Sequence, residues 1–158
     1  MSPARPASAG ILLFRSGPDG PEVLLGHMGG PLWAKRDERA WTIPKGEPLP
    51  GESLLDTARR EFAEELGSPP PDGEPIELGQ VRQSGGKVVT AFALAGDFDP
   101  DTLRSNTFEM VWPPRSGRVL QFPELDRVAW FGVPTAAAKV VTAQQELLER
   151  LVSRLRAA

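Results

Sequence analysis

The chain has 158 residues, 40% of them hydrophobic, and its 18 basic and 21 acidic residues give a net charge of −3. This length predicts one globular domain over residues 1–158, with residues 1–8 as a flexible N-terminus. The acidic balance argues against broad nucleic-acid binding, the lack of cysteine excludes disulfides and thiolate metal sites, and no apolar run could span a membrane. We expect a cytoplasmic protein and leave a homodimer open.

The first elements in chain order are two short apolar runs, 9–14 and 22–27. The turn-rich sequence SGPDGP joins them, which predicts a β-hairpin. A further strand is expected at 41–43, and it leads directly into the loop 44–46. This strand would deliver the loop to any site that the following helix forms.

A helix is predicted between Ser53 and Gly67. Ser53 is a suitable N-cap, and Gly67, followed by a serine and three prolines, ends the helix. At 100° per residue, one stripe collects the apolar residues that should face the core, which are Leu55, Ala58, Phe62 and Leu66.

The second half of the chain predicts another hairpin, 77–83 with 87–95, around a turn at 84–86. A short strand is expected at 129–133. From Pro134 onward the pattern is helical, with an apolar face of Val140, Val141, Leu147, Leu148, Leu151 and Leu155. Strands around one central helix, with a closing helix, predict an α+β sandwich with a mixed sheet.

Three carboxylates, Glu61, Glu64 and Glu65, lie on one face of the predicted helix, beside the apolar stripe. Like charges at this spacing weaken a helix, and most such faces are simply solvated. The alternative is a metal site. Ligands that are all oxygen suit a hard divalent cation, Mg²⁺ or Mn²⁺.

The segment from Gly46 to Gly67, GEPLPGESLLDTARREFAEELG, combines these features in a fixed spacing. Gly46, Glu52, the Arg60–Glu61 pair and Glu64–Glu65 occupy positions at which it resembles the Nudix box. That motif marks hydrolases of nucleoside diphosphates linked to another group. One position departs: Ser68 stands where the family usually has a bulky aliphatic residue, which affects a packing contact and not the acid cluster.

The resemblance covers roughly residues 8–155 and implies the family's α/β/α sandwich. It implies that Glu61 and Glu65 are metal ligands, that Glu64 ligates or accepts a proton from water, and that the backbone carbonyl of Gly46 is a further ligand. Arg60 and Glu52 would form a supporting ion pair that orients the ligating glutamates.

Glu124 lies six residues before Trp130, an offset at which related enzymes, including diadenosine tetraphosphate hydrolases, carry a glutamate near the metals. It would be an extra ligand or the general base. Its alternative is a loop carboxylate paired with Arg127. Lys45 directly precedes Gly46, as in family members whose lysine approaches the phosphates, and its alternative is a solvated loop lysine.

Two further segments offer candidate substrate contacts. Arg115 and Arg118, in PPRSGR, have planar guanidinium groups suited to a polyphosphate tail, although a surface loop needs no such function. Trp33, in the long segment 29–39, is predicted either to stack on a nucleobase or to plug the core beneath a charged loop.

The stretches GQVRQSGGKVVTAFAL and PPRSGRVLQFPELDRVAWF resemble a bacterial subgroup of predicted nucleoside triphosphate pyrophosphohydrolases. The resemblance therefore implies a Mg²⁺-dependent pyrophosphohydrolase acting on a small-molecule nucleotide, a triphosphate or an oxidised nucleotide. A dinucleoside polyphosphate hydrolase is the alternative, although the chain has no tyrosine to stack on a base. A non-catalytic nucleotide sensor is the competing class.

Overall fold

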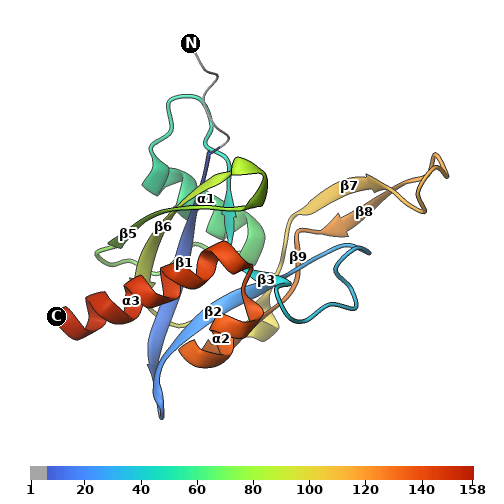
Figure 1. The fold of residues 1–158 in the computed structure, drawn as a ribbon. Helices are drawn as coiled ribbons and strands as arrows, with labels where there is room; N and C mark the ends of the chain where they lie inside the picture. Colours follow the sequence, from blue (N-terminus) through green and yellow to red (C-terminus); the bar gives the residue numbers. More distant parts are fainter. Residues whose placement is uncertain (1–6) are drawn as a thin grey trace.

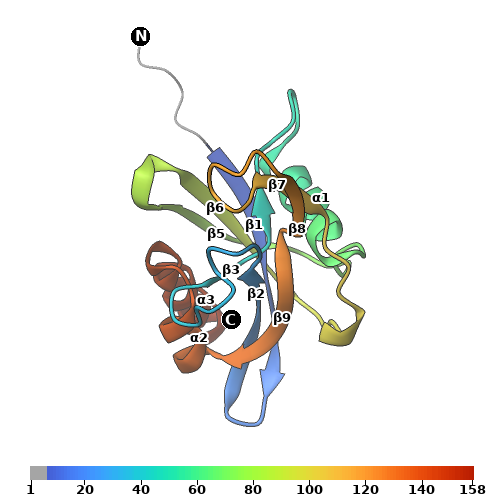
Figure 2. The same ribbon diagram turned by 90° about the vertical axis from the view of Figure 1, so that its right-hand side faces the viewer.

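A computed structural model of the chain describes residues 7–158 and has a mixed β-sheet with helices on both faces (Figures 1 and 2). The predicted α+β sandwich is therefore confirmed. Most of the N-terminal segment expected to be flexible, residues 1–6, lies outside the described residues, whereas Ala7 and Ser8 already belong to a strand. Between residues 7 and 158 no helix has the length and apolarity needed to cross a membrane.

The seven-stranded sheet has the order β3-β2-β1-β6-β5, with β4 paired to β1 and β9 paired to β2. Its strands are β1 (Ala7–Gly17), β2 (Gly20–Met28), β3 (Trp41–Thr42), β4 (Lys45–Gly46), β5 (Ile76–Arg82), β6 (Val88–Ala95) and β9 (Leu125–Gly132). Both predicted hairpins, β1–β2 and β5–β6, are confirmed. The parallel pairing of β1 with β6 joins them, and it makes the sheet mixed.

Strand β1 is buried on both faces, which explains why its sequence is an almost continuous apolar run. Leu12 packs with Trp41 and with the C-terminal helices α2 (Val133–Lys139) and α3 (Gln145–Ala157). Its neighbours Ile11 and Leu13 point to the other face, against α1 (Leu54–Leu66). Figure 2 shows the resulting three layers, with the sheet between α1 and the α2–α3 pair.

Helix α1 begins and ends as its sequence predicts. The Ser53 hydroxyl accepts a hydrogen bond from the Asp56 amide, and Gly67 adopts the left-handed conformation, with φ 91°, that favours glycine. The predicted stripe faces the sheet, because Ala58, Phe62 and Leu66 are fully buried. The face beside this stripe carries the carboxylates, next to β4.

The prediction of continuous helix from Pro134 onward is wrong. Helix α2 ends at Lys139, and Val140 is extended, with φ −73° and ψ 151°. Val140 forms a parallel bridge with Trp41, and the Val141 amide donates to the Trp41 carbonyl at 2.9 Å. A 3₁₀ turn, η3 (Thr142–Gln144), then leads into α3. Pairing with a strand end thus outweighs the helical pattern at these two β-branched residues.

A third hairpin, β7 (Thr107–Val111) with β8 (Val119–Pro123), was missing from the predicted elements. It is a separate two-stranded sheet that projects from the body of the protein (Figure 1). The segment PPRSGR, expected as a surface loop, forms the tip of this hairpin. The exposed Val111 and Val119 face each other across the pair near that tip.

Candidate active site

One cavity of about 440 Å³ collects the carboxylates of α1 with residues from several other parts of the chain. It is lined by Gly46 and Lys45 from β4, by four α1 residues, Arg60, Glu61, Glu64 and Glu65, and by Lys87, Asn106 and Glu124 from later segments. Most of the residues that sequence motifs single out therefore share one concave, strongly charged site. Such a concentration of ionisable groups in a cavity is typical of a functional site.

Arg60 organises the acidic side of this cavity, and the expected ion pair with Glu52 is present. Its Nε donates to Glu52 Oε2 and its Nη2 to Glu52 Oε1, both at 2.9 Å, which is the two-pronged geometry that suits a guanidinium. Its Nη1 donates to Glu61 at 3.0 Å and to Glu64 at 3.1 Å. The Arg60 guanidinium thus holds the side chains of Glu61 and Glu64, both of which line the cavity.

Glu52 does not line the cavity, and its surroundings suit a supporting role. Its carboxylate accepts from the Arg60 guanidinium, from the Leu49 amide at 3.0 Å and from the Thr57 hydroxyl at 2.7 Å. The hydrogen bonds from Arg60, ahead of those from Leu49 and Thr57, hold the pKa of Glu52 at about 2. Glu52 therefore stays ionised and keeps Arg60 in place.

Glu65 is the most buried of the cavity carboxylates, with an exposed fraction of 7%. Its Oε2 accepts a hydrogen bond from the Lys45 amide at 3.0 Å. Burial, followed by the negative charge of Glu61, raises the pKa of Glu65 to about 8. Burial and the charge of Glu64 also raise the pKa of Glu61. A further cation bound beside these two crowded carboxylates would stabilise their ionised forms.

Gly46 is required by the way Glu61 packs. A Cβ atom at this position would lie 2.0 Å from Glu61 Cδ and 2.3 Å from both of its oxygens, far inside van der Waals contact. The carboxylate therefore rests directly on the backbone of β4. This close approach brings the carboxylate oxygens of Glu61 beside the backbone of β4. Carboxylate and backbone carbonyl oxygens are both ligands of hard divalent cations in proteins.

The donor set fits a divalent cation, although the side chains do not yet form a cage. Over residues 7–158 no three acidic or histidine side chains already surround a common point. The reason is visible in their present partners: Glu61 and Glu64 turn to Arg60, and Glu65 turns to the Lys45 amide. Mg²⁺ usually takes only one or two carboxylates and completes its shell with water and phosphate oxygens.

Two lysines, Lys45 and Lys87, line the same cavity as the carboxylates. Burial, followed by the charge of Lys87, lowers the pKa of Lys45. Among the described residues neither lysine forms an ion pair within 4 Å. Sequence reasoning did not identify Lys87, which carries no local signal beyond its place after the turn at 84–86.

Glu124 also lines the cavity, at the junction of β8 and β9. In the described part of the chain Arg127 lies 3.6 Å from Asp126, and no ion pair joins it to Glu124. The alternative role for Glu124, a loop ion pair, is therefore absent. Asn106 anchors this corner, because its carbonyl accepts from the Glu124 amide at 2.9 Å and its amide donates to the Glu64 carbonyl at 3.0 Å.

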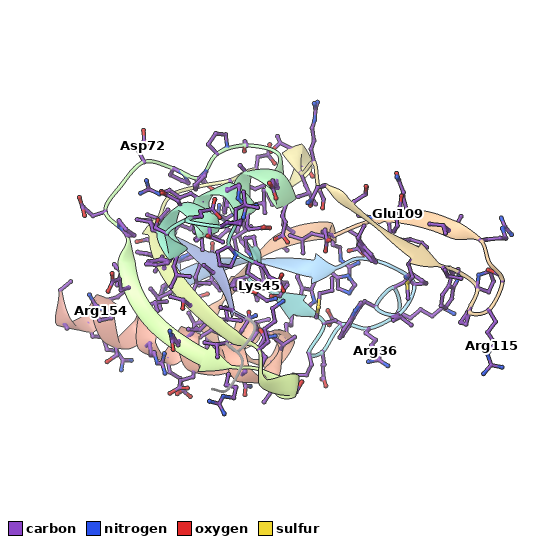
Figure 3. All side chains as sticks on the ribbon, turned by 90° about the horizontal axis from the view of Figure 1, so that it is seen from above. Arg36, Lys45, Asp72, Glu109, Arg115 and Arg154 are labelled. Carbon is purple, nitrogen blue, oxygen red and sulfur yellow. The ribbon has the colours of Figure 1, made fainter. Side chains whose placement is uncertain are left out.

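The remaining candidates do not line this cavity. Arg115 extends from the tip of the β7–β8 hairpin, well away from Lys45 (Figure 3), and Arg118 belongs to the same exposed turn. Trp33 is half-buried and packs against the core cluster that includes Trp41, with the Arg36 guanidinium 5.5 Å from its ring centre. Stacking of Trp33 on a nucleobase and phosphate contact by the two arginines both stay predictions.

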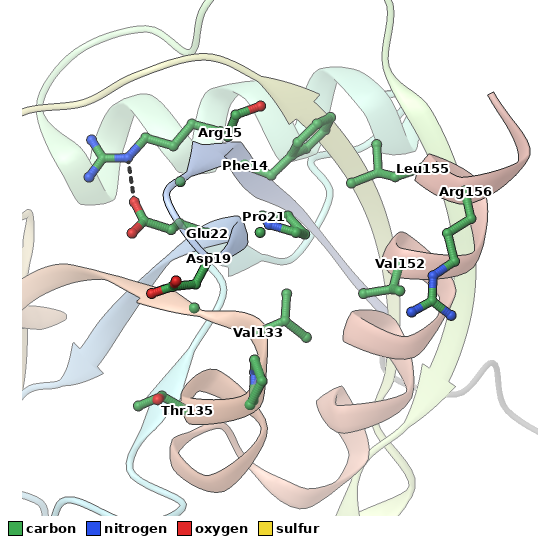
Figure 4. A pocket seen from close by; sticks show the side chains of 15 residues that line it. Phe14, Arg15, Asp19, Pro21, Glu22, Val133, Thr135, Val152, Leu155 and Arg156 are labelled. Atoms are coloured by element: carbon green, nitrogen blue, oxygen red, sulfur yellow. Dashed lines mark hydrogen bonds and ion pairs between the residues drawn. The ribbon is translucent and has the colours of Figure 1, made fainter.

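A larger cavity, of about 950 Å³, lies between the β1–β2 turn and the end of α3 (Figure 4). Apolar residues, including Phe14, Val133 and Leu155, line much of it, and its principal polar feature, the Arg15–Glu22 pair, is internally satisfied at 2.9 Å. Its other charged lining residues, Asp19 and Arg156, are one acid and one base, so it lacks the group of carboxylates found in the smaller cavity. Size alone therefore does not make it the candidate active site.

Known proteins resemble the chain in sequence pattern and in fold. A family model described as NUDIX domain matches residues 4–151. None of the curated proteins matches the chain. An Ap4A hydrolase from C. elegans, solved as a binary complex, has a TM-score of 0.68 and 21% identity over 96% of this chain and 98% of that one.

Two other solved structures are similar over nearly the whole chain. The NUDIX domain of Shewanella oneidensis NrtR, complexed with ADP ribose, has a TM-score of 0.64 and 18% identity, covering 98% of this chain and 90% of that one. The MutT protein of Methanosarcina mazei Go1 has a TM-score of 0.58 and 20% identity, covering 98% and 99%. At sequence identities of 18–21%, the similarity to these three structures shows a shared fold only.

Proposed function

Because the chain belongs to the Nudix hydrolase family, we propose that it is a Mg²⁺-dependent pyrophosphohydrolase of a nucleoside triphosphate or an oxidised nucleotide. Family membership makes it a hydrolase that acts on pyrophosphate bonds. The metal, the substrate and the roles of individual residues are our proposal. The observation that supports it is the single cavity that three helix carboxylates and Glu124 share with Lys45 and Lys87.

The residues of this cavity divide into two chemical groups. Glu61, Glu64 and Glu65, with the Gly46 carbonyl, would hold the cation, and Arg60 would keep the first two oriented through its hydrogen bonds. Bound Mg²⁺ lowers the pKa of a coordinated water and stabilises negative charge on phosphate oxygens. Lys45 and Lys87 would pair with the phosphate groups, because they are the cavity's cations without carboxylate partners.

Two carboxylates are candidates for the general base that accepts the proton of the attacking water. Glu64 is the more exposed, with 42% of its side chain accessible, and it already hydrogen-bonds to Arg60. Glu124 also lines the cavity and forms no ion pair within 4 Å among the described residues. Glutamine at the true base should remove the acidic limb of the pH dependence of kcat, whereas glutamine at the other position should leave that limb in place.

The second candidate substrate is a dinucleoside polyphosphate. Its support is the similarity to the C. elegans Ap4A hydrolase over almost the whole of both chains, together with the position of Glu124 in the cavity. The missing tyrosine weighs against it. The competing idea, a sensor without chemistry, is weakened because Glu52, Glu61, Glu64 and Glu65 are all retained and connected to Arg60 or the Lys45 backbone.

The test is a hydrolysis screen in Mg²⁺ and in Mn²⁺, with products resolved. The panel includes nucleoside triphosphates, oxidised triphosphates, diadenosine polyphosphates, ADP-ribose and nucleotide sugars. We expect preferred hydrolysis of a triphosphate, with release of a monophosphate and pyrophosphate. Preference for a diadenosine polyphosphate would select the alternative. No turnover with either metal across the panel would contradict the proposed activity.

A further inference from the structure

Gln144 lies at the end of the 3₁₀ turn η3, remote from the Nudix box in sequence, and only 1% of it is exposed. All the hydrogen-bonding groups of its side-chain amide are used. Its carbonyl oxygen accepts from the Ile43 amide at 3.0 Å, and its nitrogen donates to Thr42 Oγ1 and to Gln83 Oε1, both at 2.9 Å. Burying a side-chain amide is costly unless its own donors and acceptor are hydrogen-bonded. The three bonds of Gln144 meet that requirement, which indicates a specific arrangement.

The three partners of Gln144 belong to the two segments that carry the cavity lysines. Thr42 and Ile43 line the cavity and precede Lys45 by three and two positions in the chain, respectively. Gln83 opens the turn that ends at Lys87, because its amide donates to the Lys87 carbonyl at 2.8 Å. One buried side chain therefore connects the backbone before Lys45 with the turn before Lys87.

These two segments are not hydrogen-bonded to each other as strands. Each is placed through β1, because Lys45 belongs to β4, which pairs with β1, and Lys87 directly precedes β6, which also pairs with β1. The Gln144–Gln83 hydrogen bond adds a direct connection between the two segments. A polar side-chain network that is fully satisfied in a low-dielectric interior is more rigid than its separate bonds imply.

We propose that Gln144 is a positioning residue, which holds the Lys45 and Lys87 segments at the separation needed to grip consecutive phosphates. This inference rests on the proposed role of the two lysines. Gln144 itself does not line the cavity and acts only through the two segments. Its contribution is therefore to substrate and product affinity, and to alignment for the reaction.

The first experiment compares Gln144→Met with Gln145→Met. Methionine keeps a similar volume and removes the amide. The Gln145 variant is a matched control, because it loses one hydrogen bond from the adjacent residue, to the Ala137 carbonyl at 2.7 Å, without touching either lysine segment. We expect Gln144→Met to lower kcat/KM and the calorimetric affinity for inorganic triphosphate in Mg²⁺ by about tenfold each, the scale of coupling within one hydrogen-bond network. Gln145→Met should match the wild type.

A double-mutant cycle with Lys87→Met separates positioning from general destabilisation. If Gln144 acts through the Lys87 segment, Lys87→Met must cost much less affinity for triphosphate in the Gln144→Met background than in the wild type. Gln83→Met removes only the hydrogen bond between Gln83 and Gln144, so it should lower triphosphate affinity by a smaller factor than Gln144→Met. This variant tests the same connection if Gln144→Met does not fold.

Two results would overturn the inference: wild-type triphosphate affinity in folded Gln144→Met and Gln83→Met, or fully additive losses in the cycle. Both are measured by binding, so they do not depend on turnover. A wild-type protein that binds triphosphate but hydrolyses no nucleotide contradicts the proposed function alone. The comparison of variants by affinity then still decides the role of Gln144.

Discussion

Gly46→Ala should disable the site while leaving the fold intact. The added Cβ would lie 2.0 Å from Glu61 Cδ, so the carboxyl group must retreat by about 1.4 Å to reach an ordinary contact of 3.4 Å. The cost to stability is small, because the obstructed atoms are the end of a flexible side chain. Misplacement of a reacting group by 1 Å costs about 100-fold in rate, or about 2.7 kcal/mol of transition-state stabilisation.

The assay is kcat/KM in saturating Mg²⁺, with the melting temperature measured in parallel. The matched control is Gly132→Ala, because a Cβ there has no atom within 4 Å. The control should keep full activity, and Gly46→Ala should lose about 100-fold. Wild-type kcat/KM in Gly46→Ala would refute the argument, since it would mean that the position of the Glu61 carboxylate does not matter for turnover.

Glu65→Gln should abolish turnover, and in metal-free protein it should be more stable than the wild type by a margin that grows from pH 4.5 to about 8. The raised pKa keeps Glu65 protonated in the fold up to about pH 8, while the unfolded chain ionises near 4.5, so wild-type stability falls across that window. Lys87→Met should raise the KM for a triphosphate by about 10- to 100-fold, the value of a hydrogen bond to a charged group. Phe62→Ala should lower the free energy of unfolding by about 3–5 kcal/mol, because Phe62 is fully buried between α1 and the sheet.

Each of these three predictions has its own control. Urea unfolding in EDTA at several pH values checks Glu65→Gln, and a margin independent of pH would contradict the pKa argument. Lys35→Met, at an exposed residue outside the cavity, should leave KM unchanged. Leu32→Ala, at a side chain with 58% exposure, should change the unfolding free energy by less than about 0.5 kcal/mol. An equal change of KM in the two lysine variants, or of unfolding free energy in Phe62→Ala and Leu32→Ala, would contradict the corresponding prediction.

Sequence alone predicts the elements whose signals are local. The helix of the box is such a case, because the Ser53 cap, the apolar stripe and Gly67 all lie within one segment and agree. The two hairpins of the main sheet also have clear turns between apolar runs. The cluster of helix carboxylates follows from the same periodicity, and its link to Arg60 follows from spacing on the helix.

What sequence does not predict depends on contacts between distant segments. The break at Val140 arises from pairing with Trp41, which no pattern within the C-terminal segment records. Lys87 directly precedes β6, and β6 pairs with β1. Because β1 also pairs with β4, this arrangement brings Lys87 to the cavity beside Lys45. The hairpin β7–β8 forms its own two-stranded sheet away from the core. Its residues alternate, but none of them is fully buried, so its sequence lacks the apolar run that marks a core strand.

The cavity therefore has two parts of different origin, and this bears on substrate choice. The acidic part comes almost entirely from one helix and the adjacent loop, so its chemistry is fixed by a single contiguous motif. The basic part comes from Lys45 and Lys87, which are brought together by sheet pairing and by the buried amide of Gln144. Changes in that second part can alter which phosphate chain is gripped without disturbing the carboxylates. Substitutions at Lys87 and Gln144 should accordingly change the ranking of triphosphate against dinucleoside polyphosphate substrates, whereas substitutions at Glu61 should lower turnover of both equally.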